Sequence, residues 1–304
     1  MRIIRFSSPS GERIGVWINE KVVDITEAFE SPLRSILDLA SKANEAGKSI
    51  DDLLTDILEQ KSGHLPVYLY KKIERGEDNL RLLIPIVPPE VWGCGVTYRR
   101  SREARERETN VKSVYDLVYN AARPEIFFKA TAHRCVGPGE EIYLRGDSKR
   151  NIPEAELAFI LGFNQEILGF TAGNDVSSRD IESENPLYLP QAKIFDRCCA
   201  LGPSILTINE AGKEPKLRVE CRVFRSGKIV FEGTTSTAEM KRSIEELKSY
   251  LCRYNTIPPG SVCLTGTGII PPDEFSLIDG DIVEITIEKI GSLRNPVKQL
   301  KPII

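Results

Sequence analysis

Short apolar runs separated by polar turns open the chain, and two amphipathic stretches follow them. The runs lie at residues 3–6, 14–18 and 22–25 and are typical of short strands. Leucine and isoleucine then recur near helical spacing at 33–39 and again at 53–58. The pattern predicts a small α/β unit in roughly the first 80 residues.

A cluster of prolines separates this unit from the rest of the chain. The segment Ile84-Pro-Ile-Val-Pro-Pro89 breaks both the helical and the strand period, because proline lacks the N–H group that helices and sheets use. We therefore place a domain boundary there. Residues 1–84 are expected to form the small N-terminal α/β domain, and residues 85–304 the larger domain.

Strand patterns dominate the larger domain. Most of the runs are bounded by Gly, Pro or Asp, and they lie at 91–96, 125–130, 157–162, 216–224, 228–232, 261–265 and 281–287.

Two helical patterns interrupt these strands. The first ends at Arg123-Pro124, since a residue before proline avoids the helical region, and its apolar face is Val111, Val114, Tyr115 and Val118. The second has its predicted start at Ser236 and Glu239, which have the spacing of a capping box, and its apolar face is Met240, Ile244, Leu247 and Leu251.

Charge and hydropathy narrow the classes of partner. The 304 residues include 41 Lys and Arg against 44 Asp and Glu, a formal charge of -3, so there is no overall basic field for nucleic acid or anionic membranes. Apolar runs such as 157–163 are far shorter than the roughly 18 residues of a membrane span, and residues 1–10 do not resemble a signal peptide. We expect a cytoplasmic protein that binds a small molecule.

The arginine-rich segment 99–108 does not change this expectation. Glu103, Glu106 and Glu108 are interleaved with its arginines, which favours a solvated helix with ion pairs such as Glu103 with Arg107. Its position beside Tyr98 leaves open whether the segment closes over a substrate as a lid.

Several common cofactor sites are not indicated. Seven cysteines contain no CxxC pair and there are only two histidines, too few soft ligands for a structural zinc site, so we expect reduced thiols packed in the core. Gly93-Cys-Gly95 lacks the spacing of a dinucleotide-binding loop, and no GxxxxGK[ST] motif occurs. The sequence therefore indicates neither a nicotinamide nor an ATP site.

Three carboxylates provide the strongest candidate chemistry. Glu154 and Glu156 precede or begin an apolar strand and would project from the same face, and Asp175 follows the next strand. Carboxylates this close repel one another unless one is protonated or a cation lies between them. Oxygen ligands without Cys or His favour Mg²⁺, Mn²⁺ or Ca²⁺ over zinc.

Two further segments could complete such a site. Residues 185–193 are rich in proline, are expected to be irregular, and carry Tyr188, Gln191 and Lys193. A lysine near a bound cation or in a dry pocket loses proton affinity and can act as a base. The turn Leu264-Thr-Gly-Thr-Gly-Ile269 offers hydroxyl and backbone N–H groups for a carboxylate or oxyanion.

Taken together, these motifs resemble the fumarylacetoacetate hydrolase superfamily over nearly the whole chain. The resemblance rests on GCGVTY at 93–98, EAE at 154–156, NDVSSRD at 174–180 and LTGT at 264–267, with shorter matches at 4–6, 15–16, 22–24, 128–129, 137–139, 201–203 and 280–284. It implies an α+β fold, in which a small N-terminal α/β domain adjoins a larger domain of mixed β-sheets (a β-roll), usually in a homodimer or homotetramer. It also implies that Mg²⁺ is held by Glu154, Glu156 and Asp175, that Lys193 is an active-site lysine and that Thr267 contacts substrate.

Departures from the family pattern indicate a branch of the family. Hydrolytic members carry a water-activating His and Glu where this chain has Ser101 and Ala104, neither of which takes a proton near neutral pH. Residues 123–130 and 184–193 instead resemble the sugar-acid dehydratases. The resemblance implies a Mg²⁺-dependent dehydratase, a hydro-lyase, that converts a 2-keto-3-deoxy sugar acid of five carbons into 2-oxoglutarate semialdehyde.

The roles in such a reaction follow from its chemistry. The metal would chelate the substrate's C1 carboxylate and C2 carbonyl and so acidify the C3 hydrogens. Lys193 is the first choice for the base and Glu125 for the acid that protonates the leaving C4 hydroxyl, although the two roles can be exchanged. Thr267 would fix the carboxylate, and the other substrate-binding residues would be Tyr98, Lys129, Tyr188 and Gln191.

Two alternatives stay open at this point. An acylpyruvate or fumarylacetoacetate-type carbon–carbon hydrolase of the same fold could use His133, or a water held by Glu125, in place of the missing His and Glu. A non-catalytic protein could keep the pocket to bind keto acids. Retention of the three carboxylates together with Lys193 argues against the second alternative.

Overall fold

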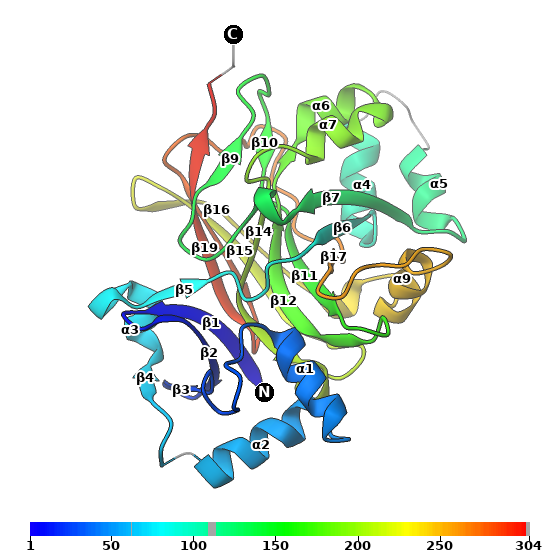
Figure 1. The fold of residues 1–304 in the computed structure, drawn as a ribbon. Coiled ribbons are helices and arrows are strands. Elements are labelled where there is room, and N and C mark those ends of the chain that lie inside the picture. Colours follow the sequence, from blue (N-terminus) through cyan, green and yellow to red (C-terminus); the bar gives the residue numbers. More distant parts are fainter. Residues whose placement is uncertain (62, 109–113, 302–304) are drawn as a thin grey trace.

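Two large β-sheets form the body of the protein (Figure 1), in a computed structural model that describes residues 1–61, 63–108 and 114–301. The larger sheet has the order β4-β3-β2-β1-β14-β12-β11-β17-β6-β7, with β5 beside β1 and β8 beside β14. Its strands are β1 (Arg2–Ser8), β2 (Gly11–Ile18), β3 (Lys21–Asp24), β4 (Val67–Leu69), β5 (Arg81–Leu83), β6 (Glu90–Gly95), β7 (Glu125–Thr131), β8 (Cys135–Val136), β11 (Ala155–Leu161), β12 (Ile167–Asp175), β14 (Cys199–Thr207) and β17 (Val262–Leu264).

The second sheet packs against the first, and a short strand pair lies beside them. The second sheet has the order β16-β15-β18-β19-β9 and consists of β9 (Ile142–Leu144), β15 (Arg218–Arg225), β16 (Lys228–Ser236), β18 (Ile282–Ile287) and β19 (Gly291–Gln299). The short pair is β10 (Asn151–Ile152) with β13 (Ser177–Ser178). This mixture of sheets with peripheral helices confirms the predicted α+β fold.

Helices lie at the outside of the sheets (Figure 1). They are α1 (Ile36–Glu45), α2 (Ile50–Lys61), α3 (Tyr70–Arg75), α4 (Arg99–Glu108), α5 (Val114–Asn120), α6 (Arg179–Glu184), α7 (Leu189–Lys193), α8 (Ile208–Ala211) and α9 (Ile244–Leu251). In Figure 1, α4, α5, α6 and α7 gather at the upper end of the sheets, while α1 and α2 lie at the opposite end. None of the helices in these described ranges combines the length and apolar character needed to cross a bilayer.

Two expectations about the helices differ from the structure. The second helix of the larger domain begins at Ile244 rather than near Ser236, because Ser243 is its N-cap and accepts a hydrogen bond from the N–H of Glu246. Ser236 instead caps a short 3₁₀ turn. The proline-rich segment 185–193, expected to be irregular, forms a 3₁₀ turn followed by α7, with Pro190 in the first turn where proline is tolerated.

The helix predicted around Val111–Val118 corresponds to α5, and Val111 lies outside the described residues. The solvated helix predicted at 99–108 corresponds to α4. Its described ion pairs join Glu103 to Arg99 at 2.8 Å and to Arg102 at 3.7 Å, while the predicted pair with Arg107 falls on side chains outside the described part.

The strands β11, β12 and β14 are the centre of the larger sheet. Every residue of β11 is buried, and so are all of β14 and all but the first residue of β12. A strand buried on both faces reads as a continuous apolar run, as Leu157–Leu161 does. One continuous apolar core surrounds these strands and also includes Leu39 of α1 and Leu54 of α2.

The N-terminal strands continue the larger sheet, because Arg2 and Ile3 of β1 pair with Leu206 and Ile205 of β14. The predicted division at residues 84 and 85 therefore falls between segments that share a sheet and a core. The two-domain boundary stays a prediction.

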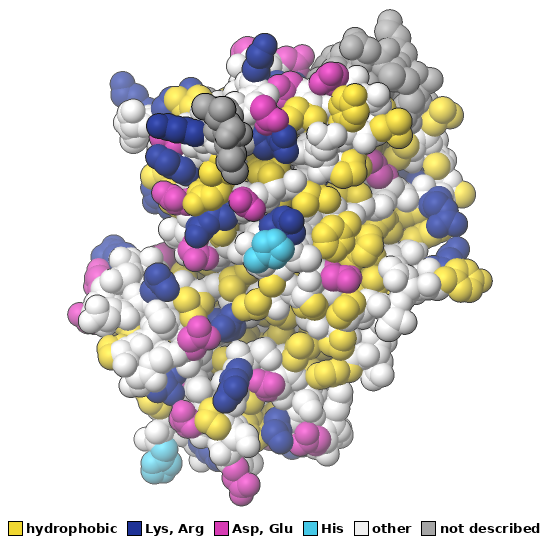
Figure 2. All heavy atoms as spheres, turned by 45° about the horizontal axis from the view of Figure 1, so that its top comes forward, with side chains coloured by type: hydrophobic (Ala, Val, Ile, Leu, Met, Phe, Trp, Pro, Cys, Tyr) yellow, Lys and Arg dark blue, Asp and Glu magenta, His cyan; other side chains and the backbone are white. Residues whose placement is uncertain are grey.

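Cationic and acidic side chains are interspersed over the face drawn in Figure 2. A nucleic-acid-binding surface would instead gather lysines and arginines into a stripe or patch. This face therefore agrees with the formal charge of -3 in offering no extended basic surface.

A glycine tests the packing of the central strands. A Cβ atom at Gly169 would lie well inside van der Waals contact with the carbonyl oxygen of Leu206 on β14. We expect Gly169→Ala to lower the free energy of unfolding by about 1–3 kcal/mol in urea titrations. The control Gly63→Ala, whose Cβ would have no atom within 4 Å, should stay within about 0.5 kcal/mol of the parent. Equal unfolding midpoints for the two variants would contradict the close approach of β12 and β14.

Candidate metal centre and active site

The register between β11 and β12 brings the three carboxylates together. Glu156 lies opposite Gly173, and the N–H of Asp175 donates to the carbonyl oxygen of Glu154 at 3.0 Å. Alternate residues share one face of a strand pair, so Glu154, Glu156 and Asp175 project from the same face. Gly173, the fourth position of this face, leaves room for the side chain of Leu264, which a Cβ atom there would meet.

These three residues form the one candidate cation-binding group among the described residues. Each offers a carboxylate oxygen, the three oxygens lie within 4.8 Å of one another, and all three residues are buried. Burial and the neighbouring Asp175 and Glu154 raise the pKa of Glu156 well above its ordinary value. Burial also raises the pKa of Asp175, but ion pairs with Lys129 and Lys193 outweigh it, so that the net pKa shift is downward.

Lys193 lies between two of these carboxylates. The side chain comes from the last residue of α7 and is 1% exposed. Its ammonium group donates to Glu154 Oε2 at 2.7 Å and to Asp175 Oδ2 at 2.8 Å. It also donates to Ser177 Oγ at 2.6 Å. The predicted active-site lysine is therefore next to the predicted metal ligands, as an ammonium ion bound to them.

Lys129 lies behind this group rather than on a substrate-binding surface. It is fully buried on β7, and its ammonium is 2.5 Å from Asp175 Oδ1. The same ammonium donates to the backbone oxygens of Val176 and Lys193 at 2.9 and 2.6 Å. The structure thus gives Lys129 contacts that hold Asp175 and the backbone at Lys193, and does not place it where it was expected to line the pocket.

Two residues that the sequence did not single out complete the cluster. Arg179 of α6 is fully buried and donates to Glu154 Oε1 at 2.9 Å. It also pairs with Glu182 Oε2, one turn along α6, at 3.4 Å. The six residues Lys129, Asp175, Lys193, Glu154, Arg179 and Glu182 form a continuous buried chain in which positive and negative charges alternate.

Glu156 stands outside this alternating chain. Its Oε2 accepts a hydrogen bond from the N–H of Gly266 at 2.5 Å, but within the described part of the chain it has no ion pair. The three positive and three negative charges of this series of ion pairs cancel. Glu156 is therefore the one carboxylate of the three whose charge is not balanced by an ion pair among the described residues. A buried carboxylate surplus beside two more oxygen ligands suits a divalent cation such as Mg²⁺.

The turn at 264–269 contacts Glu156 of the carboxylate group and also forms part of the wall of an adjacent cavity. Gly266 adopts φ +91°, and a Cβ there would collide with Thr97 Oγ1, so the close approach requires glycine. Its N–H points at Glu156, not at a site for substrate. Thr267 lines the cavity, where its hydroxyl also accepts from the N–H of Ile269 at 3.1 Å.

A small cavity adjoins the carboxylates and brings several predicted residues together. Its volume is about 10 Å³, close to the least that holds one water molecule. Glu125 lies in its wall, and the absence of a side chain at Gly95 makes room for the Glu125 carboxylate across β6. The lining residues are Cys94, Gly95, Val96, Ser101, Glu125, Phe127, Glu154, Glu182, Leu189, Lys193, Gly266 and Thr267.

Three other predicted substrate-binding residues lie outside this lining. Tyr98 is buried beside it, and burial together with Glu156 raises its pKa. Tyr188 is 37% exposed. Gln191 is also exposed, and its backbone oxygen accepts from Arg145 at 3.2 Å. Contacts of these side chains with a substrate stay predictions.

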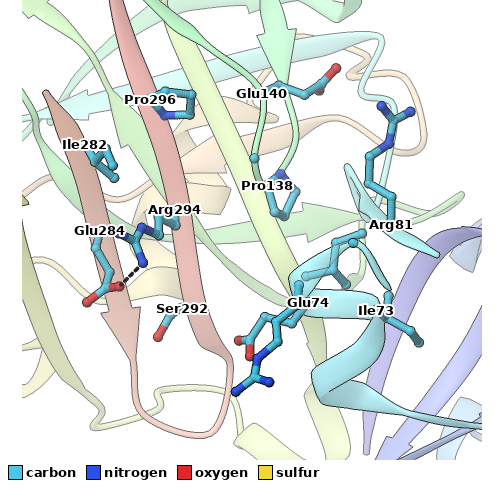
Figure 3. A pocket seen from close by; sticks show the side chains of 14 residues that line it. Ile73, Glu74, Arg81, Pro138, Glu140, Ile282, Glu284, Ser292, Arg294 and Pro296 are labelled. Carbon is cyan, nitrogen blue, oxygen red and sulfur yellow. Dashed lines mark ion pairs between the residues drawn. The ribbon is translucent and has the colours of Figure 1, made fainter. Parts of the chain in front are cut away.

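A larger cavity lies elsewhere in the described structure. It measures about 730 Å³ and lies between α3, the turn at Pro138 and the strands β18 and β19 (Figure 3). There Arg294 and Glu284 point toward each other, 4.0 Å apart. Its size suits a ligand, but it contains none of the predicted site residues, so we place the chemistry at the small cavity.

Comparisons with known proteins find chains that are similar over most of this one. The family model described as fumarylacetoacetate (FAA) hydrolase C-terminal matches residues 90–298. The chain is 43% identical over 289 residues to a probable 2-keto-3-deoxyxylonate dehydratase of Haloferax volcanii, covering 95% of this chain and 96% of that protein. It is also 43% identical over 297 residues to a 2-dehydro-3-deoxy-D-arabinonate dehydratase of Saccharolobus solfataricus, covering 95% of each.

A solved structure is similar over the whole chain. It is a 2-keto-3-deoxy-D-arabinonate dehydratase complexed with magnesium and 2,5-dioxopentanoate, with a TM-score of 0.79 and 37% identity. The match covers 99% of this chain and 100% of that one.

Removal of ligand charges tests the metal centre. We expect Glu156→Gln and Asp175→Asn each to weaken Mg²⁺ binding by on the order of 100-fold in calorimetric titrations, because each removes a buried anionic ligand. Glu59→Gln, a change at an exposed position of α2, should leave the affinity unchanged. Wild-type affinity in both ligand variants would contradict a metal centre at these residues.

Proposed function

Because the chain belongs to the fumarylacetoacetate hydrolase family, we propose that it is a Mg²⁺-dependent dehydratase of the carbon–oxygen lyase class. Its substrate is a 2-keto-3-deoxy sugar acid such as 2-keto-3-deoxy-D-arabinonate. The product is 2-oxoglutarate semialdehyde, which is the same compound as 2,5-dioxopentanoate. The observation that carries the proposal is the meeting of three buried carboxylates with Lys193 and Glu125 at one cavity.

Glu154, Glu156 and Asp175 would hold the cation. Bound there, Mg²⁺ supplies Lewis-acid stabilisation of the negative charge that develops on the keto acid when a C3 proton leaves. Mn²⁺ and Ca²⁺ share this preference for oxygen ligands. The hydroxyl of Thr267, at the cavity wall, orients the substrate's carboxylate.

Lys193 and Glu125 then move the two protons of the elimination. The ammonium of Lys193 would first lose a proton to solvent, which a neighbouring bound cation favours. The neutral amine then takes the C3 proton as base, and Glu125 protonates the C4 hydroxyl so that it leaves as water. Both side chains line the same cavity, which general acid–base catalysis requires. Tautomerisation of the unsaturated product gives the aldehyde.

The arrangement of the cavity favours this reaction over hydrolysis of a carbon–carbon bond. Ser101 lies in the cavity wall, where a hydroxyl is no base near neutral pH, and Ala104 is buried. His133, the alternative base, is exposed beside Thr131 at the far end of β7. Five strand residues separate Thr131 from Glu125, a span of about 20 Å, and His133 is not among the residues that line the cavity.

Mass spectrometry of the reaction mixture tests the function. We expect the purified full chain to remove one water from racemic 2-keto-3-deoxy-pentonate with Mg²⁺, and to leave the compound unchanged with EDTA. Pyruvate released from an acylpyruvate, without loss of water from the sugar acid, would favour the hydrolase. Binding of either keto acid without turnover would favour a binding protein.

Two variants test the assigned roles. Lys193→Ala and Glu125→Gln should each lower kcat by about 10²–10⁴-fold, the usual contribution of a general acid or base. The circular dichroism spectrum and the melting temperature identify a variant that has failed to fold. Near wild-type rates in both folded variants would overturn the assignment.

We also propose a homodimer or homotetramer in the cytoplasm. The edge strand β16 leaves Ile229 and Val230 about half exposed, at 50% and 41%, and a second copy could cover them. Seven free cysteines suit a reducing compartment. Light scattering coupled to size-exclusion chromatography should give two or four times the chain mass, and a monomer mass would overturn the oligomer.

A further inference from the structure

Cations already contact both oxygens of two proposed metal ligands. In Asp175, Lys129 lies against Oδ1 and Lys193 against Oδ2. In Glu154, Arg179 lies against Oε1 and Lys193 against Oε2. Of these three cations, Lys193 alone contacts both carboxylates and so bridges them.

The two outer cations do not line the cavity, and each has further anchoring contacts. Lys129 is fully buried and also donates to the backbone oxygens of Val176 and Lys193. Arg179 is fully buried and also pairs with Glu182. Displacing either side chain would leave a buried charge without its partner and would leave backbone or carboxylate oxygens without a hydrogen bond. Both changes raise the free energy of the folded state.

Lys193 differs from both in its surroundings. Its side chain forms part of the cavity wall, next to Glu125 and Thr267. A lysine side chain is a flexible four-carbon stem with a compact charge, so its ammonium can change place without movement of the backbone. The oxygens that can be made available to an entering cation are consequently Glu154 Oε2 and Asp175 Oδ2.

We propose that the Lys193 ammonium occupies the place of the divalent cation and competes with it for Glu154 Oε2 and Asp175 Oδ2. Binding of Mg²⁺ moves the ammonium off these oxygens and into the cavity, while Lys129 and Arg179 keep their oxygens. This inference rests on the proposed metal centre and adds a role for Lys193 before any substrate is bound.

The competition accounts for two features of the site. Three buried carboxylates within 4.8 Å would repel one another without a cation, and the bridging ammonium supplies one. The metal also places Lys193 in the cavity, where the proposed reaction needs it. Loading of the metal and positioning of the base would then be one event.

Mg²⁺ affinity of the full chain, measured by calorimetry without substrate, tests this inference. Lys193→Met removes the competing cation, so we expect Mg²⁺ to bind about tenfold more tightly or better, a gain of about 1.4 kcal/mol. The matched control is Lys129→Met, which removes an equally buried lysine from the same carboxylate. It should not tighten binding, because it releases the ordered position of Asp175.

Long-range repulsion between the lysines and Mg²⁺ predicts a different result from direct competition for the same carboxylate oxygens. If the lysines only repel Mg²⁺ at a distance, both variants should bind it more tightly and to a similar extent. That result would overturn the inference, as would weaker or unchanged binding in Lys193→Met. If the wild-type chain dehydrates the keto acid with Mg²⁺ in these cases, the proposed function stands and the inference alone fails.

Melting experiments give a second measurement that is independent of affinity. In EDTA, Lys193→Met and the more conservative Lys193→Gln should melt below the wild type, because three carboxylates then face one another without the bridging cation. Saturating Mg²⁺ should raise the melting temperature of both variants more than that of the wild type. An equal rise in all three proteins would contradict the competition, and a variant that folds only with Mg²⁺ would support it.

Discussion

Three carboxylates on one face of a fully buried strand pair are the constraint on which the rest of the site depends. Removing a carboxylate from water costs several kcal/mol unless a cation and hydrogen bonds replace the lost solvation. The chain supplies three cations from three different elements, Lys129 on β7, Arg179 on α6 and Lys193 on α7. These ion pairs consequently hold the short helices α6 and α7 against the upper end of the sheets (Figure 1).

This charge balance also explains how the fold prepares a metal centre. The alternating chain from Lys129 to Glu182 balances its own charges, and Glu156 remains as a surplus acid held by the N–H of Gly266. In the proposed function, a divalent cation balances this surplus charge and binds the keto acid. Because Lys193 belongs both to the ion chain and to the cavity, the proposed base is tied to the state of the metal site.

Much of the site could be predicted from the sequence, because its main residues lie in short motifs. Glu154, Glu156 and Asp175 stand at the edges of strong strand patterns, and Lys193 was identified through the family resemblance. Arg179 was inside a quoted motif, and Glu182 lies one turn further along the same helix. Their pairing with Glu154 depends on how α6 packs, so spacing alone could not reveal it. The same holds for Lys129, whose position behind Asp175 depends on the pairing of β7 in the sheet.

Prediction of the strands also depended on how clear the local sequence pattern was. Strands with clear apolar runs were predicted within a few residues, whereas β14 and β19 were not. Gly202 and Pro203 interrupt the first, and the second is mostly polar and contains Pro296. The most direct test of the account is a pair of crystal structures, without metal and with Mg²⁺. The account predicts Lys193 Nζ within about 3 Å of Glu154 and Asp175 in the first. In the second it predicts the ion in that place, with the ammonium in the cavity and Lys129 unmoved. An ammonium that keeps both contacts beside bound Mg²⁺ would contradict it.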